Sequence, residues 1–207
     1  MPILGYGEDA LTYWAFSQHM AQVIGPLPLG DNSPLGEVLF VYRPSFGRAG
    51  GEGGSQFGEF DAIVGTPVAV YLVESKWRLP ILDGQLTLAQ RQVVRHRIFR
   101  WLREHWFAQH PDNWGQFVAA NDAQFRCQFH GLHLAQPTTI LASNLEFLLR
   151  QLDNCGQKIY DVLLYFRLAD GPWPENGVVV PGGGPPFVVI PFVYQPLNRR
   201  GIINMEA

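Results

Sequence analysis

The stretch GEFDAIVGTPVAVYLVESKW, residues 58–77, places charged side chains inside a run that is otherwise apolar. It reads as two β-strands, because β-branched and aromatic residues dominate it and a Gly/Pro turn divides it. Both faces of the second strand are apolar at its start, which is typical of a central strand covered on both sides. The stretch therefore predicts buried strands that carry Asp61, Glu74 and Lys76.

The two strands are expected over residues 58–65 and 70–77. Alternate side chains of a strand share a face. Glu74 and Lys76 therefore extend an apolar stripe at the C-terminal end of the second strand. Charged groups in such a place need an explanation other than core packing.

The register between these strands decides whether the acidic residues meet. A loop over residues 66–69 places Asp61 directly opposite Glu74, and in the same register Glu59 faces Lys76. A slip of one residue would send Asp61 to the other face. Two carboxylates opposite one another repel and destabilise the strand pair. A divalent cation removes that cost, and oxygen ligands are those that Mg²⁺ selects.

The residues themselves thus predict Asp61 and Glu74 as ligands of Mg²⁺ (or Mn²⁺), with the backbone carbonyl of Ser75 as a third ligand. The cation would polarise a phosphate. Lys76 would stabilise the charge that develops on phosphorus or help to position a water molecule. The alternative is a simple pairing of Glu74 and Lys76 with neighbouring charges such as Arg78 at the strand edge.

The rest of the chain alternates between helical and strand patterns. Helices are predicted over residues 7–23 and 85–109, and a third helix is expected to open with a capping box at Ser143 and to close at Gly156. Strands are predicted over residues 37–43, 125–134, 138–142, 158–168 and 187–194, and a glycine-rich loop over 47–58. This order predicts a mixed α/β fold.

The 207 residues predict one domain, 1–207, with a Pro/Gly-rich C-terminal extension over about 171–207. Apolar residues make up 47% and charged residues 16%, as in globular proteins. The formal charge of -3 argues against tight non-specific binding of nucleic acid. No signal peptide and no membrane span is evident, which predicts a cytoplasmic protein without a membrane partner.

FDAIV, the twelve residues between Asp61 and Glu74, and ESK at the end of an apolar strand resemble the signature of the PD-(D/E)XK nuclease superfamily. The resemblance covers roughly residues 5–135. It implies a restriction-endonuclease-like core, a central mixed β-sheet flanked by helices, in the order helix, three strands, helix, strand. It also implies Asp61 and Glu74 as Mg²⁺ ligands and Lys76 as the catalytic lysine.

Many members of the superfamily add a glutamate on the first helix, for which Glu8 is the match. An acidic residue at a helix N-terminus also has an ordinary explanation in the helix dipole. The Pro that gives the motif its name is missing before Asp61. Some subfamilies carry a Gln and an aromatic residue four positions later on the second helix, but Gln85 and Gln90 lack that partner.

Arginines near the predicted site are candidates for contacts with phosphate groups: Arg43, Arg48, Arg91 and Arg95. Further along the long helix, His96, Arg97, Arg100 and Arg103 are expected on a solvated polar face.

Two functions of different classes follow. The first is a Mg²⁺-dependent nuclease that hydrolyses phosphodiester bonds of nucleic acid. DNA is its expected substrate, and the protein could act as a homodimer. The second is a nuclease-like fold without catalysis that serves as a binding or assembly module, suggested by the acidic pI and the many aromatic residues.

Overall fold

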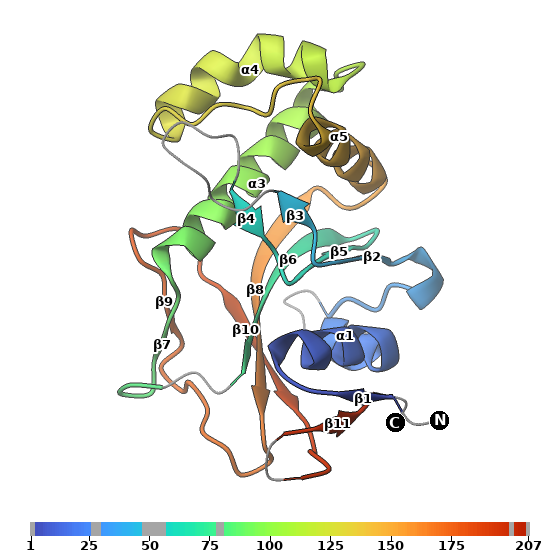
Figure 1. Ribbon diagram of the computed structural model, residues 1–207, viewed down its shortest axis with the longest axis vertical. Helices are drawn as coiled ribbons and strands as arrows, with labels where there is room; N and C mark the ends of the chain where they lie inside the picture. Colours follow the sequence, from blue (N-terminus) through green and yellow to red (C-terminus); the bar gives the residue numbers. More distant parts are fainter. Residues whose placement is uncertain (1–2, 26–29, 47–56, 78–80, 199–200, 206–207) are drawn as a thin grey trace.

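The computed structural model describes residues 3–25, 30–46, 57–77, 81–198 and 201–205 (Figure 1). The helices are α1 (Glu8–Gln18), α2 (Met20–Ile24), the 3₁₀ helix η1 (Leu35–Glu37), α3 (Gln90–Gln109), α4 (Trp114–Gln128) and α5 (Ile140–Leu152). The strands are β1 (Leu4–Gly5), β2 (Leu39–Tyr42), β3 (Ser45–Phe46), β4 (Gly58–Glu59), β5 (Ala62–Gly65), β6 (Ala69–Trp77), β7 (Leu86–Thr87), β8 (Lys158–Arg167), β9 (Val178–Val179), β10 (Val188–Val193) and β11 (Ile203–Asn204).

A five-stranded mixed sheet forms the centre of the molecule, in the order β10-β8-β6-β5-β2. Strands β6, β8 and β10 are parallel, whereas β5 and β2 are antiparallel to their neighbours. The mixed α/β fold with a central mixed sheet and helices is therefore confirmed. Strand β6 lies in the middle of the sheet and is buried from Ala69 to Ser75, so the predicted central strand is confirmed as well.

Helices cover both faces of this sheet because the strands are apolar on both sides. On one face, Val70 and Leu72 of β6 join a core with Phe99 of α3 and with residues of α4 and α5. On the other face, Tyr71 and Val73 pack in a second core with residues of α1 and α2. Figure 1 shows α3, α4 and α5 gathered at one end of the molecule, away from α1.

The register of β5 and β6 is the predicted one. Gly65 pairs with Val70 and Ala62 with Val73, so Asp61 comes at the end of the ladder, level with Glu74. The expected pairing of Glu59 with Lys76 is wrong. The chain bends at Asp61, and Gly58–Glu59 form β4, which pairs with β3 and places Glu59 opposite Ser45.

The C-terminal third is more than an appended loop, because three of its strands pair with strands from earlier in the chain or with β8. β10 pairs with β8 in parallel and forms an edge of the central sheet. β11 pairs with β1, and β9 pairs with β7. The predicted strands 158–168 and 187–194 are confirmed as β8 and β10.

Two predicted strands are wrong. Residues 125–134 include the end of α4, whose buried residues Trp114, Phe117, Asn121 and Phe125 recur every three to four positions. This helical period outweighs the local alternation of aromatic residues. Residues 138–142 include the start of α5, where Thr139 rather than Ser143 caps the helix by accepting a hydrogen bond from the Ala142 N–H.

The remaining helix predictions hold with shifted ends. The first predicted helix is split at His19 into α1 and α2. The long helix begins at Gln90, because Leu86–Thr87 form β7 instead. Of the glycine-rich loop, residues 47–56 lie outside the described part of the chain. None of the described helices is long and apolar enough to cross a membrane.

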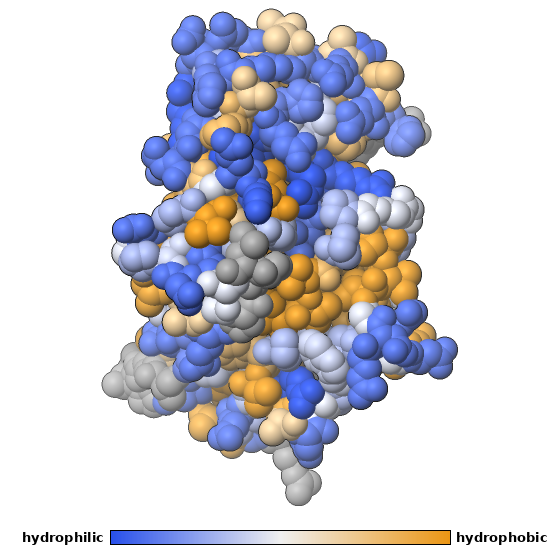
Figure 2. All heavy atoms as spheres, turned by 180° about the vertical axis from the view of Figure 1, so that it is seen from behind, coloured by the Kyte–Doolittle hydropathy of each residue, from blue (hydrophilic) through white to orange (hydrophobic). Residues whose placement is uncertain are grey.

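The reverse side of the molecule differs in polarity along its length. Figure 2 shows hydrophilic side chains over the α4 end of this face, whereas apolar side chains gather over its middle. Ile140 and Phe147 are further large apolar residues that remain mostly exposed, both on α5. Apolar surface of this kind is common on soluble domains and indicates a partner only when it is extensive.

Candidate functional site

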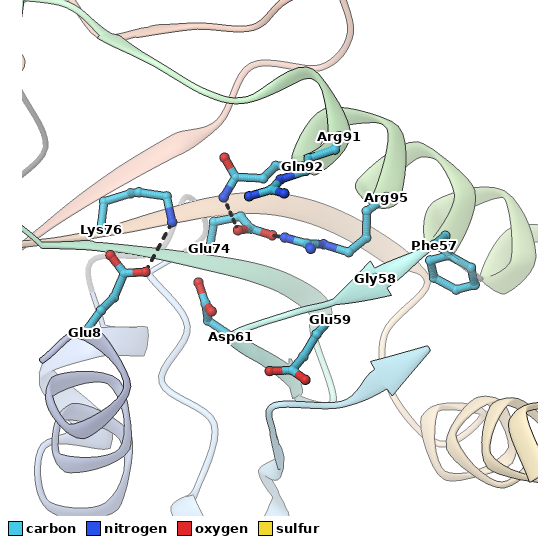
Figure 3. Close-up of a pocket in the computed structure, with 10 residues that line it drawn as sticks. All are labelled: Glu8, Phe57, Gly58, Glu59, Asp61, Glu74, Lys76, Arg91, Gln92 and Arg95. Atoms are coloured by element: carbon cyan, nitrogen blue, oxygen red, sulfur yellow. Dashed lines mark hydrogen bonds and ion pairs between the residues drawn. The ribbon is translucent and has the colours of Figure 1, made fainter. Parts of the chain in front are cut away.

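A pocket of about 530 Å³ opens where the end of β6 meets the beginnings of α1 and α3 (Figure 3). Six of the residues that the sequence singled out line it: Glu8, Asp61, Glu74, Lys76, Arg91 and Arg95. They come from four separate parts of the chain. The fold therefore brings the predicted catalytic residues and several of the weaker candidates to one place.

Asp61 enters the pocket at the bend between β4 and β5, one residue before β5 begins. Its Oδ2 atom accepts a hydrogen bond of 2.6 Å from the backbone N–H of Ser75 on β6. Its backbone carbonyl accepts one from the N–H of Arg43 at 3.2 Å. These two bonds set the side chain against β6 beyond the last paired residues of the ladder.

Lys76 and Glu8 join the end of β6 to the start of α1. The Lys76 Nζ lies 3.4 Å from Glu8 Oε1 and also donates to the backbone carbonyl of Ser75. The Glu8 Oε2 accepts a bond of 2.9 Å from the backbone N–H of Trp77. Figure 3 shows Lys76 extended toward Glu8, Glu74 turned toward α3, and Asp61 between them.

Glu74 is 1% exposed and is surrounded by donors from α3. Arg95 forms an ion pair with its Oε1, and the His96 Nε2 lies 3.1 Å from the same atom. Gln92 donates to its Oε2 at 2.7 Å. Burial by itself would raise the pKa of Glu74, but the His96 hydrogen bond and the Arg95 charge outweigh it and lower the pKa to about 2.

His96 continues this network into the protein. Its Nδ1 lies 2.8 Å from Oδ1 of Asp161 on β8, and the Arg100 guanidinium contacts the other Asp161 oxygen at 2.9 Å. Burial would lower the pKa of His96, but the hydrogen bonds to Asp161 and Glu74 raise it. The expectation that His96 belongs to a solvated face is wrong, because its ring is 2% exposed between two carboxylates.

Asp61 is in the opposite electrostatic situation. Burial and the negative charge of Glu74 raise its pKa to about 7, against the smaller lowering effects of Lys76 and the Ser75 N–H. Its Oδ1 accepts no hydrogen bond from the described residues. The pocket therefore contains one carboxylate that is fully neutralised by its neighbours and one that is not.

The oxygen atoms of this pocket are of the kind that binds a divalent cation. The Asp61 Oδ1 atom accepts no hydrogen bond from the described residues, and the carboxylates of Glu8, Glu59 and Glu74 line the same pocket. Hard cations such as Mg²⁺ take such ligands. The Ser75 carbonyl accepts a hydrogen bond from the Lys76 Nζ. Within the described residues no three acidic, His or Cys side chains are arranged as a ligand set. Both oxygens of Glu74 accept hydrogen bonds from α3.

The arginine candidates divide into three groups. Arg91 and Arg95 line the pocket. Arg43 is not among the lining residues; its guanidinium forms ion pairs with Asp9 and with Glu59, which does line the pocket. Arg48 lies outside the described residues. We therefore still expect contacts with phosphate from Arg91 and Arg95. Arg43 instead links α1 to the bend before β5 through its ion pairs with Asp9 and Glu59.

The sequence reasoning missed Gln92 and His96. Residues four apart on a helix lie on the same face, and both side chains reach Glu74 from that face of α3. Gln85 and Gln90 have no aromatic residue four positions later, whereas Gln92 has His96 at that position. The same spacing starting at Gln92 would have identified both residues.

Comparisons with protein-family models, with curated proteins and with solved structures returned no match for this chain.

Proposed function

We propose that the protein is a divalent-metal-dependent nuclease that hydrolyses phosphodiester bonds of nucleic acid, with DNA as the leading substrate. The observation that carries this proposal is the convergence of Asp61, Glu74 and Lys76 on one pocket at the end of β6. Two acidic residues and an amine in this arrangement are what metal-assisted phosphoryl chemistry needs.

The order of the central elements supports a restriction-endonuclease-like core within this proposal. Helix α1, strands β2, β5 and β6, helix α3 and strand β8 follow one another along the chain. This is the helix, three strands, helix, strand order that the resemblance implies. Helices α4 and α5 are additional and lie between α3 and β8.

In the proposed site, Asp61 and Glu74 hold Mg²⁺ or Mn²⁺, with the Ser75 carbonyl and Glu8 as further oxygen ligands. A bound cation supplies Lewis acidity toward the phosphate. Lys76 places its positive charge beside the phosphate oxygens, where charge grows during the reaction. Arg91, which lines the same pocket, binds a neighbouring phosphate group.

The pocket lining combines three basic side chains with four carboxylates, so its own formal charge does not offset the acidic total of the chain. The formal charge of -3 repels a polyanion at long range. Lys76, Arg91 and Arg95 nevertheless line one cavity together. We therefore expect binding that depends on the pocket rather than a broad basic surface, and a second copy of the chain in a homodimer remains compatible with it.

The test is cleavage of supercoiled plasmid, linear duplex DNA and single-stranded RNA in Mg²⁺ or Mn²⁺, with a chelator as blank. Asp61→Asn and Lys76→Met should each lower the rate by about 100-fold or more, because the first removes a carboxylate ligand of the cation and the second removes the positive charge beside the phosphate. Asp170→Asn and Lys158→Met, at exposed positions far along the chain, are matched controls. Equal cleavage by wild type and the two pocket variants would exclude the proposed chemistry.

The second candidate is a nuclease-like fold that binds a partner without catalysis. The saturation of both Glu74 oxygens by Gln92, Arg95 and His96 favours it, since the cluster is stable without a cation. Titration calorimetry separates the two functions. A module of this kind binds no divalent cation in a manner that depends on Asp61 and Glu74, whereas the proposed nuclease does.

A further inference from the structure

Arg95 lines the pocket and neutralises the buried Glu74. Its guanidinium forms an ion pair with Glu74 Oε1, and its side chain is only 11% exposed. The guanidinium carbon lies 5.1 Å from the centre of the Phe60 ring. Its Nε is buried and has no hydrogen-bond partner among the described residues. Among the described residues, the arginine is thus held by one carboxylate and one ring, without a second ion pair.

The chain leaves room for this guanidinium at Gly58. Gly58 has a φ of +106°, which side-chain-bearing residues rarely adopt. A Cβ atom there would lie 3.0 Å from Arg95 Nη1. The backbone of β4 therefore approaches Arg95 closely, and Figure 3 shows Gly58 at the same side of the pocket.

We propose that Arg95 and a divalent cation bind Glu74 in alternation, so that the guanidinium neutralises Glu74 in the metal-free protein and leaves it when a cation binds. The inference rests on the proposed function, because it concerns the cation of that site. A buried carboxylate needs a positive partner. Arg95 and a cation satisfy this need at the same oxygen atom, where two positive charges would repel each other.

The exchange gives Arg95 a second role. Once it has left Glu74, the guanidinium still lies in the pocket beside Arg91 and Lys76. Its planar fork of donors suits the two oxygens of a phosphate group. Cation binding therefore presents a further phosphate donor to the substrate.

The experiment measures binding of Mn²⁺ alone to the full chain, by electron paramagnetic resonance of the free ion. Arg95→Met should bind Mn²⁺ about 10- to 100-fold more tightly than wild type, because the competing ion pair is gone. Arg91→Met removes a positive charge from the same pocket without touching Glu74. Arg91→Met should tighten Mn²⁺ binding by only a few-fold. This change measures how much the loss of any positive charge from the pocket favours the cation.

A double-mutant cycle with Glu74→Gln isolates the exchange from that general effect. Glu74→Gln removes a ligand and should weaken Mn²⁺ binding, and in that background Arg95→Met should no longer tighten it, because no carboxylate is left to compete for. Arg95→Lys, which keeps the charge but not the fork, should fall between wild type and Arg95→Met. It also replaces the Met variant if circular dichroism shows that the latter does not fold.

The results distinguish a failure of the Arg95 exchange from a failure of the proposed metal site. If wild type binds Mn²⁺ and the Arg95→Met and Arg91→Met variants bind it equally well, Arg95 does not compete and the inference is overturned while the metal site stands. If neither wild type nor any variant binds Mn²⁺, the metal site is overturned and the inference with it.

Discussion

Two carboxylates of one pocket are shifted in opposite directions: the pKa of Glu74 is lowered and the pKa of Asp61 is raised. Glu74 lies near 2 because α3 supplies an imidazole and a guanidinium at hydrogen-bond distance. Asp61 lies near 7 because it is buried and faces the charge of Glu74. Environments that push the pKa values of paired acids apart are a feature of functional sites.

Asp61 should therefore make the metal-free protein less stable as the pH rises. Its folded pKa is about 7 and its unfolded value 3.8, so between these values the folded state binds more protons than the unfolded state. The free energy of unfolding should fall through this range by at most about 1.4 kcal/mol per pH unit. Asp61→Asn, whose amide carries no charge, should remove this slope.

Urea unfolding of both proteins at several pH values between 4 and 8, with a chelator present, measures the effect. The matched control is Asp170→Asn, because residue 170 is exposed; it should keep the wild-type slope. Parallel curves for wild type and Asp61→Asn would show that Asp61 does not titrate with a raised pKa.

At the scale of elements, the turn between β5 and β6 is held by two other parts of the chain. Asp31 accepts hydrogen bonds from Thr66 Oγ1 at 2.6 Å and from the Tyr71 hydroxyl at 2.8 Å. The Gly156 N–H, beyond the end of α5, donates to the Thr66 carbonyl at 2.9 Å. These contacts fix the register on which the position of Asp61 depends.

Gly156→Ala should disrupt this junction. A Cβ at residue 156 would lie 2.0 Å from the carbonyl carbon and oxygen of Val68, so the backbone of the turn must move. Overpacking of this kind costs about 1–3 kcal/mol. Gly36→Ala is the control, since nothing lies within 4 Å of a Cβ at that position. Thermal unfolding followed by circular dichroism measures both, and equal stabilities would show that the turn yields without cost.

The element scale also shows what pattern analysis can and cannot detect. The β5–β6 register was predictable, because a short loop and apolar strands leave few alternatives. Helix α4 was not recognised, because Phe125, Cys127 and Phe129 alternate as in a strand. The burial of Trp114, Phe117 and Asn121 that reveals the helix depends on α5 and α3 packing against it.

At the scale of the whole molecule, the chain ends are integrated with the sheet. β10 covers the open edge of β8, and β11 pairs with β1 near the start of the chain. Ile190, Phe192 and Ile203 contribute to the same core as α1. The region that composition describes as a Pro/Gly-rich extension thus supplies part of the support for β8 and, through it, for Asp161.

Removal of residues 171–207 should therefore abolish cooperative unfolding rather than trim a loop. The truncated chain would leave the β8 edge and the apolar core beneath it open to water. A paired substitution refines this test. Ile190→Ala, at a position that is 1% exposed, should cost about 2–5 kcal/mol, whereas Val193→Ala, at 49%, should cost far less. A truncated chain with a native-like, cooperative thermal transition would contradict this account.

By itself the sequence determined the strands β5 and β6, their register and the meeting of Asp61 with Glu74 and Lys76. These features depend on residue alternation and on a turn between adjacent segments, which are local properties. Only the tertiary structure decided which charges neutralise Glu74. Gln92, Arg95 and His96 reach it because α3 lies across β6, and Asp161 meets His96 because β8 lies beside β6. Spacing along α3 places Gln92 and His96 on one face of the helix, but that this face meets Glu74 depends on the packing of distant segments.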